Sequence, residues 1–298
     1  MVTGGAGFIG STLVDRLLAE GHAVDVVDDL SSGTLANLAE ARAGGGQQLS
    51  FNRLDVRSPD LVDLMARRHP EVVFHLAAQV DVRSSVLDPV HDAHVNVVGS
   101  LNVLEGARAG GATKVVFASS GAADQPVSPY GVAKRTVTEY LRVYRELHEL
   151  EFTSLALTNV FGPRQDPEGE GGVVAIFAGR LLSGQPCTIY GDGSQIRDFV
   201  YVDDVVDAFA RAATRGGGLL LNIGTGMETS IRDLHRMMAG AMGADEPPEF
   251  APARGGELDR MVADPARAGI HLGWKPWTTL EDGVASVLRW CHDQSAAD

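Results

Sequence analysis

A tyrosine and a lysine stand four residues apart in the stretch SSGAADQPVSPYGVAK, which runs from Ser119 to Lys134. Ser128 is a favourable helix N-cap and Pro129 a favourable first helical residue, so the spacing predicts a helix with Tyr130 and Lys134 on one face. A phenol has a pKa of about 10, and a neighbouring ammonium stabilises its phenolate form. The pair could therefore act as a general base.

The alternative for this pair is an ordinary i,i+4 contact on a helix surface. The chain has five tyrosines and only three lysines, so a Tyr–Lys pair at this spacing is rare by chance. The pattern further along predicts that the helix continues with an apolar stripe formed by Val137, Tyr140, Leu141 and Tyr144. The Tyr130–Lys134 pair is the sharpest chemical signal in the sequence.

A second signal is VTGGAGFIGS, which places Gly4, Gly7 and Gly10 between a short strand and a helix. Such glycines permit a tight turn and let backbone N–H groups approach a pyrophosphate at a helix N-terminus. The chain has 35 glycines, so this motif alone could be no more than a strand–helix turn. A second strand ending at Asp28 places an acid where a ribose 2′-hydroxyl would lie, which predicts dinucleotide binding. With no arginine nearby for a 2′-phosphate, NAD is favoured over NADP.

The elements that must position these residues alternate between β-branched runs and helical patterns. This alternation predicts an α/β fold with a Rossmann-type doubly wound parallel sheet. A helix with apolar residues at helical spacing should end at Gly21, which suits a C-cap. The expected strands are Met1–Thr3, Val24–Asp28, Leu49–Asn52, Val72–Leu76, Val115–Ala118 and Phe152–Leu157.

After Leu157 the rhythm changes to loops rich in Gly and Pro, such as FGPRQDPEGEGG, and loops of this kind often contact ligands. The runs RDFVYVDD from Arg197 and LLLNIGTG from Leu219 again indicate strands. We predict an NAD-binding Rossmann domain over residues 1–158. Residues 159–298 should form mainly a smaller, irregular α/β substrate-binding lobe, with a segment near 196–224 returning to the Rossmann domain.

The composition narrows the possible partners. A net charge of −14 argues against nucleic-acid and anionic-membrane surfaces, and an anionic ligand would need locally placed arginines. The two cysteines form no paired framework and no Cys/His cluster, so neither disulfides nor a metal site is expected. No long apolar run or charged leader is seen, so we expect a cytoplasmic protein without a membrane span.

The chain resembles the extended short-chain dehydrogenase/reductases, and among them the nucleotide-sugar 4-epimerases typified by UDP-glucose 4-epimerase. The likeness runs nearly end to end, through TGGAGFIGS, VDDLSSG, LDVRS, VVFHLAAQVDVRSSV, VNVVGS, SPYGVAK, NVFGPRQ, YGDGSQIRDFVYVDDV and LNIGTG. The resemblance implies NAD-dependent 4-epimerisation of a nucleotide-diphosphate hexose, with a UDP-hexose such as UDP-glucose or UDP-galactose expected, through a 4-keto intermediate. It also implies a homodimer built on the helical stretches Ala93–Ala107 and Pro129–Leu147.

The resemblance also assigns roles to residues. Tyr130 and Lys134 would be catalytic, with Lys134 on the nicotinamide ribose, and Asp28 would bind the adenosine ribose. The cofactor set it implies is Gly4, Gly7, Phe8, Ile9, Gly10, Asp28, Asp29, Ser32, Gly33, Asp55, Val56, Leu76, Ala77, Ala78, Gln79, Asn96, Ser119, Tyr130 and Lys134. The substrate set is Ser120, Tyr130, Asn159, Val173, Arg197 and Arg254, the two arginines holding the diphosphate. Asp55 as a turn acid, Asn96 as a helix polar residue and the arginines as solvated charges remain alternatives.

One departure lies between the serine pair and the tyrosine. In the family, a small residue, a Ser or Thr and an aromatic–Gly pair follow the serines, and a longer segment then leads to the catalytic tyrosine. Here nine residues separate Ser120 from Tyr130. The third catalytic hydroxyl must therefore come from Ser119 or Ser120, of which we choose Ser120, unless residues are missing from the sequence at this point.

Other functions remain open. A nucleotide-sugar 4,6-dehydratase or a UDP-glucuronate decarboxylase would use the same cofactor, but the dehydratase needs an acid pair in the serine loop. The stretch SSGAADQ contains only Asp124. A third possibility, from another class, is an NAD-binding regulatory protein whose shortened loop has weakened catalysis.

Overall fold

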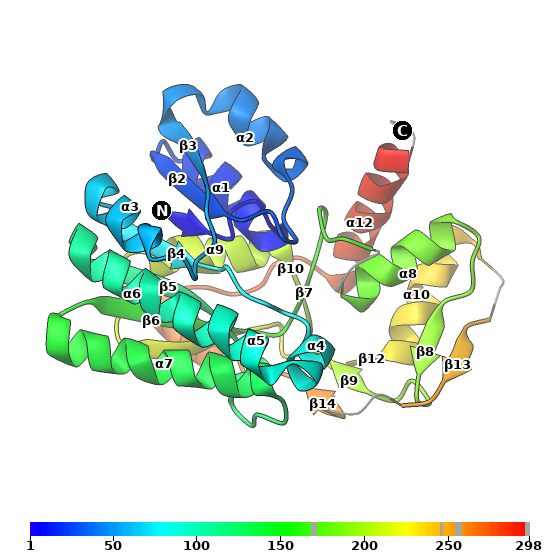
Figure 1. Cartoon of the computed structure of the whole chain (residues 1–298). Coiled ribbons are helices and arrows are strands. Elements are labelled where there is room, and N and C mark those ends of the chain that lie inside the picture. The colour runs from blue at the N-terminus through cyan, green and yellow to red at the C-terminus, as the bar shows by residue number, and fades with distance from the viewer. Residues whose placement is uncertain (168–171, 245–246, 254–257, 296–298) are drawn as a thin grey trace.

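A seven-stranded parallel sheet forms the centre of the larger lobe in the computed structural model, which describes residues 1–167, 172–244, 247–253 and 258–295 (Figure 1). The strand order is β11-β6-β5-β4-β1-β2-β3, so the predicted doubly wound α/β fold is confirmed. The strands are β1 (Val2–Thr3), β2 (Val24–Asp28), β3 (Leu49–Arg53), β4 (Val72–His75), β5 (Lys114–Ser120), β6 (Glu151–Leu157) and β11 (Leu219–Ile223).

Strand β5 carries the serine pair. It begins one residue before the predicted Val115 and continues past the predicted end at Ala118, because Ser119 and Ser120 pair with residues of β6. Both serines therefore lie at the carboxyl end of the sheet, the edge at which ligands bind in open α/β folds.

Helices cover both faces of the sheet, and the alternation of side chains along β5 shows why. Val115 and Phe117 are buried in one core with residues of α3, α6 and α7, whereas Val116 and Ala118 belong to the core shared with α1 and α9. Figure 1 shows α6 and α7 side by side on the near face. The five helices are α1 (Phe8–Ala19), α3 (Asp60–Arg68), α6 (Gly99–Gly110), α7 (Pro129–His148) and α9 (Val202–Ala212).

Helix α7 begins as predicted, with Ser128 as N-cap accepting a hydrogen bond from the Gly131 backbone N–H at 3.3 Å. Its predicted apolar stripe is buried at Val137 and Leu141, but Tyr140 is 38% exposed. Helix α1 ends at Ala19, two residues before Gly21, which has a φ of 87°.

A continuous helical run leads into α6. It consists of α5 (Pro89–Ala93), the π-helical turn η3 (His94–Val98) and α6 itself. Asp88 caps α5 by accepting a hydrogen bond from the His91 N–H at 2.9 Å. The remaining short elements of this lobe are η1 (Leu35–Leu38), α2 (Ala39–Gly44), η2 (Gly46–Gln48), α4 (Val82–Leu87) and η4 (Gly121–Ala123).

The smaller lobe lies on the right in Figure 1 and contains short strands with the helices α8, α10 and α12. Phe177 and Trp274 are each 1% exposed and extend the core that contains Val116. The strand pairs are β7 (Asn159–Phe161) with β10 (Phe199–Tyr201), β8 (Thr188–Tyr190) with β13 (Glu249–Ala251), and β9 (Ile196–Arg197) with both β12 (Thr229–Ser230) and β14 (Arg260–Met261). The helices are α8 (Val173–Leu182), α10 (Ile231–Met242) and α12 (Leu280–Ser295). Helix α11 (Ala266–Leu272) packs against β11 and α9 of the larger lobe.

Part of the second half of the chain returns to the larger lobe. Strand β11 pairs with β6, and α9 contacts α1. Both elements lie within the segment 196–224 for which such a return is expected. The division into domains at residue 158 stays a prediction.

Within the described residues, no helix is both long and apolar enough to cross a bilayer.

Candidate functional site

A crevice is expected where the strand order of the sheet reverses, because the chain leaves neighbouring strands there toward opposite sides. In this sheet the reversal lies at β1, which has β2 on one side and β4 on the other. The loops after β1 and β4 touch, since a Cβ on Gly4 would lie 2.6 Å from the backbone N of Ala77. Gly4 also has a φ of 70°, so two constraints require glycine at this position.

The glycine loop packs tightly against itself and against the loop after β2. A Cβ on Gly10 would lie 2.0 Å from the carbonyl oxygen of Gly4, and one on Gly33 would lie 2.7 Å from the carbonyl carbon of Ala6. Gly7 is the N-cap of α1 and offers no side-chain hydrogen bond to the first turn, which also contains no acid. The N–H groups of this turn are thus available to an anion such as a pyrophosphate.

Asp28 ends β2 beside this turn and is 7% exposed. Its carboxylate accepts hydrogen bonds from the Ala6 N–H at 2.9 Å and the Leu30 N–H at 2.8 Å. Burial raises the pKa of Asp28, and these two bonds partly oppose that change. The two bonds hold the acid at the position where a ribose hydroxyl is expected.

An arginine lies closer to this region than the sequence indicated. Arg57 acts electrostatically on Asp29, but its guanidinium binds the Asp55 carboxylate, with Nε 3.0 Å and 2.9 Å from the two oxygens. This ion pair lowers the pKa of Asp55. Because Arg57 is already paired with an acid, the preference for NAD over NADP is retained.

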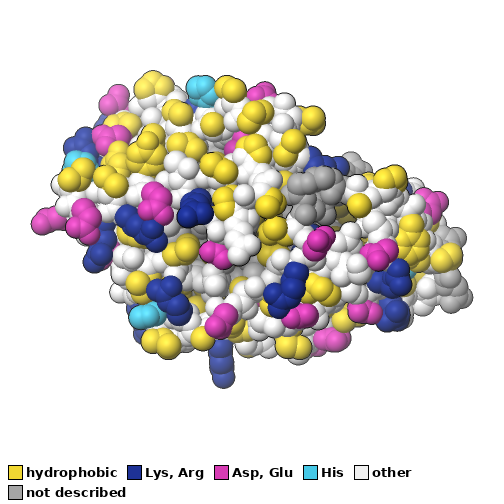
Figure 2. Space-filling model, turned by 90° about the horizontal axis from the view of Figure 1, so that it is seen from below, with side chains coloured by type: hydrophobic (Ala, Val, Ile, Leu, Met, Phe, Trp, Pro, Cys, Tyr) yellow, Lys and Arg dark blue, Asp and Glu magenta, His cyan; other side chains and the backbone are white. Residues whose placement is uncertain are grey.

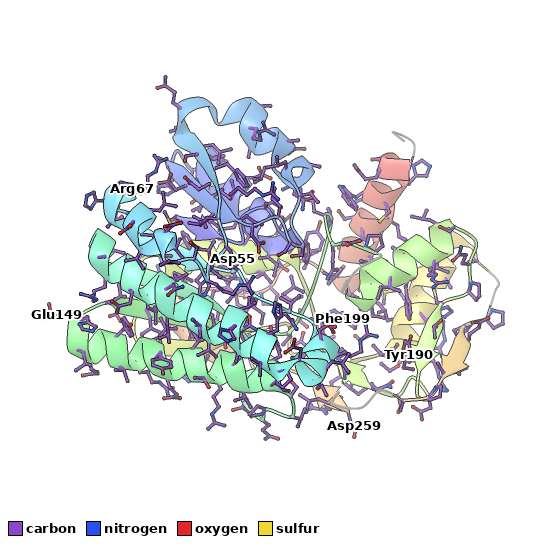
Figure 3. The ribbon with its side chains drawn as sticks, viewed as in Figure 1. Asp55, Arg67, Glu149, Tyr190, Phe199 and Asp259 are labelled. Atoms are coloured by element: carbon purple, nitrogen blue, oxygen red, sulfur yellow. The ribbon has the colours of Figure 1, made fainter. Side chains whose placement is uncertain are left out.

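The loop after β3 carries Asp55 and Val56 of the expected cofactor set. Val56 is buried, and its carbonyl oxygen accepts a hydrogen bond from the Asn102 side chain at 3.0 Å. Ser32 is exposed, whereas Phe8 and Ile9 at the start of α1 are partly buried. Figure 3 shows Asp55 in the larger lobe, Tyr190 in the smaller lobe and Phe199 between them in this view.

The loop after β4 is held by Asn96. The Asn96 Oδ1 accepts a hydrogen bond from the Gln79 N–H at 2.9 Å, and its Nδ2 donates to the Gln79 carbonyl oxygen at 2.9 Å. Leu76, Ala77 and Ala78 in the same loop are partly buried. Two buried atoms expected near the cofactor, Gln79 Oε1 and Ser119 Oγ, have no hydrogen-bond partner within the described part of the chain. Unpaired buried polar atoms of this kind suit a polar ligand.

The predicted catalytic residues lie together. The Ser120 hydroxyl forms a hydrogen bond with the Tyr130 hydroxyl. Lys134 is 3% exposed, and its Nζ donates to the Ala118 carbonyl oxygen at 2.9 Å while lying 5.7 Å from the centre of the Tyr130 ring. A hydroxyl, a phenol and an ammonium are thus arranged at the carboxyl end of β5.

Burial changes the titration of both catalytic groups. It raises the pKa of Tyr130 to about 12, an effect that the Ser120 hydrogen bond partly opposes and Asp92 strengthens. It lowers the pKa of Lys134 to about 8, against an opposing effect of Asp92. The protein groups alone do not lower the pKa of Tyr130 as the Tyr130–Lys134 spacing led us to expect, because desolvation outweighs them.

The short segment between Ser120 and Tyr130 favours Ser120 as the third hydroxyl. Ser120 Oγ also accepts a hydrogen bond from the Ala122 N–H at 3.2 Å, which begins the turn η4. A Cβ on Gly121 in this turn would lie 3.4 Å from the Met261 Sδ. Ser119 Oγ, in contrast, is buried and contacts no polar partner among the described residues. The choice of Ser120 stays a prediction.

The expected substrate residues come from three elements of the second half. Asn159 in β7 donates to the Asp198 carbonyl oxygen at 3.4 Å, and Arg197 in β9 is partly buried. Val173 begins α8 and is partly buried. Arg254 lies outside the residues that the structure describes. The roles of these residues stay predictions.

Sequence reasoning missed three buried groups. Asp198 is fully buried and accepts hydrogen bonds from the loops after β11 and β14, and its position next to Arg197 in RDFVYVDD could have indicated it. His75 lies between Thr3 and Ser100, and burial lowers its pKa to about 3, so it is neutral.

The third missed group is Asp92, which is 1% exposed and accepts a hydrogen bond from Asn96 Nδ2 at 2.8 Å. The spacing of four residues between Asp92 and Asn96 on one helical run was the available signal.

Comparisons with known proteins agree with this geometry. A UDP-glucose 4-epimerase of Mycolicibacterium smegmatis is 50% identical over 311 residues, with 99% of each chain covered. This span exceeds the 298 residues of the present chain, so that relative has additional residues.

Solved structures of UDP-glucose 4-epimerases are also similar to this chain. A crystal structure of UDP-glucose 4-epimerase with UDP-glucose from Thermotoga maritima has a TM-score of 0.94 at 39% identity, covering 99% of this chain and 98% of that one. The Thermus thermophilus UDP-glucose 4-epimerase complex with NAD has a TM-score of 0.90 at 39% identity, covering 98% of each chain. The model of the NAD dependent epimerase/dehydratase family matches residues 1–224, and the chain belongs to this family.

Proposed function

We propose that this protein is an NAD-dependent 4-epimerase that interconverts UDP-glucose and UDP-galactose. The observation that carries this proposal is the contact of Ser120 and Lys134 with Tyr130 at the carboxyl end of β5, beside the glycine crevice. The similarity over the whole chain to UDP-glucose 4-epimerases supports the choice of substrate.

The residues present fit NAD. Gly4, Gly10 and Gly33 leave no room for a Cβ, so the backbone of the turn can approach a pyrophosphate. Asp28 would bind the adenosine ribose, and Lys134 the nicotinamide ribose. When bound, NAD supplies the hydride chemistry at C4 of the sugar.

In the mechanism we infer, Tyr130 Oη accepts the proton of the sugar 4-hydroxyl as C4 is oxidised to a ketone. Ser120 Oγ donates a hydrogen bond that positions this oxygen, and the Lys134 ammonium stabilises the Tyr130 phenolate. The 4-keto sugar then turns over in the site. Reduction of its other face and return of the proton from Tyr130 give the C4 epimer.

The substrate diphosphate requires local positive charge, because the protein has a net charge of −14. Arg197 is the candidate within the described residues, and Arg254 is a second candidate outside them. Asp198 accepts four hydrogen bonds from the neighbouring loops and so fixes the backbone next to Arg197. Asn159 and Val173 would contact the remainder of the nucleotide sugar.

The rival functions are less well supported. The dehydratase needs an acid pair after the serines, whereas Asp124 is the only acid between Ser119 and Tyr130. A regulatory protein without activity would not need Lys134 and Ser120 to contact Tyr130.

We also infer that the protein is a homodimer. The helical run α5–η3–α6 and helix α7 expose apolar side chains, among them Val90 at 65%, Val132 at 52% and Leu147 at 70%. A cavity of about 600 Å³ lies between α5, η3 and the start of α7. On the face seen in Figure 2, hydrophobic side chains lie among charged ones. A second copy would bury two such helices in a four-helix contact.

We expect the enzyme to work in the cytoplasm, where its two cysteines stay reduced.

The test of the proposed function is NMR of the products formed by purified protein without added cofactor. UDP-glucose should give a mixture that contains UDP-galactose, because a reaction that returns its hydride needs no cofactor exchange. The N-acetyl, uronate and dTDP analogues serve as competing substrates. If the protein turns over neither UDP-glucose nor any of these analogues, the proposal is contradicted. A 4-keto-6-deoxy product would support the dehydratase.

A further inference from the structure

A buried acid lies behind the catalytic pair. Asp92 in α5 is 1% exposed, and the carboxylate has one side-chain hydrogen bond among the described residues, from Asn96 Nδ2 at 2.8 Å. It lines the cavity between α5 and α7, and among the described residues lining that cavity it is the only one with a charged side chain. A carboxylate in such apolar surroundings lowers stability, so stability does not explain its presence.

The neighbouring hydrogen bonds fix which atom of the Asn96 amide faces Asp92. Asn96 Oδ1 is occupied by the Gln79 N–H, so Nδ2 must point toward the Gln79 carbonyl and the Asp92 carboxylate. Asn96 lies in the π-helical turn η3, a distortion that often marks functional sites. Asp92 therefore helps to hold the loop that we expect to contact the cofactor.

A neutral amide could make the same hydrogen bond, so the charge of Asp92 requires a further explanation. The Asp92 carboxylate favours the ammonium form of Lys134 and disfavours the phenolate form of Tyr130. Burial raises the pKa of Asp92, and Asn96, Lys134 and His91 lower it in part.

Several titratable and charged side chains lie on the elements around this carboxylate. Elements packed against α5 carry Arg83 on α4, His94 on η3, and Tyr130, Lys134 and Arg135 on α7, while Asp88 caps α5. Lys134 and His91 act electrostatically on Asp92 and lower its pKa. His75 lies behind Lys134, but it is neutral over the working pH range.

We propose that Asp92 is a positioning residue for the Tyr130–Lys134 pair, in which its buried carboxylate orients the Asn96 amide and sets the electrostatic potential at both catalytic side chains. This inference rests on the proposed epimerase function. It assigns Asp92 no contact with the substrate. The choice of Asp rather than Asn keeps Lys134 charged at a depth where desolvation favours its neutral form.

The test separates charge from shape. Asp92→Asn keeps a hydrogen-bonding oxygen toward Asn96 and removes the charge. Because the carboxylate favours the protonated form of both Tyr130 and Lys134, both limbs of the pH–rate profile should move to lower pH by at least about half a unit. Glu146→Gln, which removes an exposed charge on α7, should leave the profile in place.

A second measurement does not depend on activity. The chain has only three lysines, so NMR of protein labelled with ¹³C-lysine can follow each side chain, with Lys134→Arg assigning the signal. In NAD-loaded protein, Asp92→Asn should lower the titration midpoint of Lys134, and Asp92→Ser should do the same if Asp92→Asn does not fold.

An unchanged Lys134 midpoint and pH profile in a folded Asp92→Asn protein would overturn the inference while leaving the epimerase function intact. A lowered midpoint in a protein that turns over no nucleotide sugar would support the electrostatic role and reject the function.

Discussion

Replacing Gly10 by Ala tests the cofactor crevice by sterics alone. The added Cβ would lie 2.0 Å from the Gly4 carbonyl oxygen and 2.8 Å from its carbon, whereas ordinary contacts begin at 3.4 Å. The turn must therefore open by about 1.4 Å. Overpacking of a backbone contact costs about 1–3 kcal/mol, and if this cost falls on the bound form the Kd for NAD rises roughly 5- to 150-fold.

The assay for this prediction is isothermal titration calorimetry with NAD, together with the nicotinamide released from denatured protein. Gly240→Ala in α10 is the matched control, since its Cβ would meet no atom within 4 Å and alanine is the better helix former. The control should retain NAD and unfold at the same temperature or a higher one. A Gly10→Ala protein that binds NAD with the wild-type Kd would refute the reasoning about the crevice.

Four further substitutions test the three catalytic residues and the buried histidine. Tyr130→Phe should lower kcat by about 10²- to 10⁴-fold while the binding of NAD and UDP-sugar is retained. Ser120→Ala should lower kcat by a smaller factor. Steady-state kinetics together with binding isotherms tests both predictions. Lys134→Met should move the acid limb of the pH–rate profile to higher pH, because Tyr130 then ionises without a neighbouring cation, and an unmoved limb would exclude this role. His75→Gln should lower the free energy of unfolding at pH 7. It should also remove the wild-type decline in that free energy, roughly 1.4 kcal/mol for each pH unit below pH 6.5, as urea titrations at several pH values would show. The sign follows from the folded pKa of about 3, since between pH 3 and 6.5 the unfolded chain binds the extra proton.

The sequence predicted the sheet well because its inner strands are largely buried and its strands alternate with helices. The Val24–Asp28 strand has the predicted bounds, and the start of α7 followed from the capping preference of Ser128 and Pro129. The extension of β5 through Ser119 and Ser120 could not be predicted from propensity, because pairing with β6 decides it. The small strands β7, β8, β12, β13 and β14 of the second half were missed for the same reason, since each has only two or three residues, whereas β10 lies in the predicted run RDFVYVDD.

Pattern reasoning was less successful with groups that act through others. His75 and Asp198 lie within motifs quoted above, and Asp92 lies four residues before Asn96. Their importance, however, depends on burial and on partners from distant parts of the chain, such as Ser100 for His75 and Ala263 for Asp198. Similarly, spacing alone placed Lys134 beside Tyr130, but it could not show that desolvation raises the pKa of the tyrosine. Such effects require the three-dimensional environment.

The central claim is that hydride leaves and returns to C4 of one UDP-sugar within one site. The most direct test uses UDP-glucose with deuterium at C4, incubated with purified protein in ordinary water without added NAD. We predict UDP-galactose that retains the deuterium at C4, as seen by proton NMR and mass spectrometry. Tyr130→Phe protein should lose turnover and therefore should not form this product. UDP-galactose with hydrogen from solvent at C4, or no epimer at all, would contradict the account.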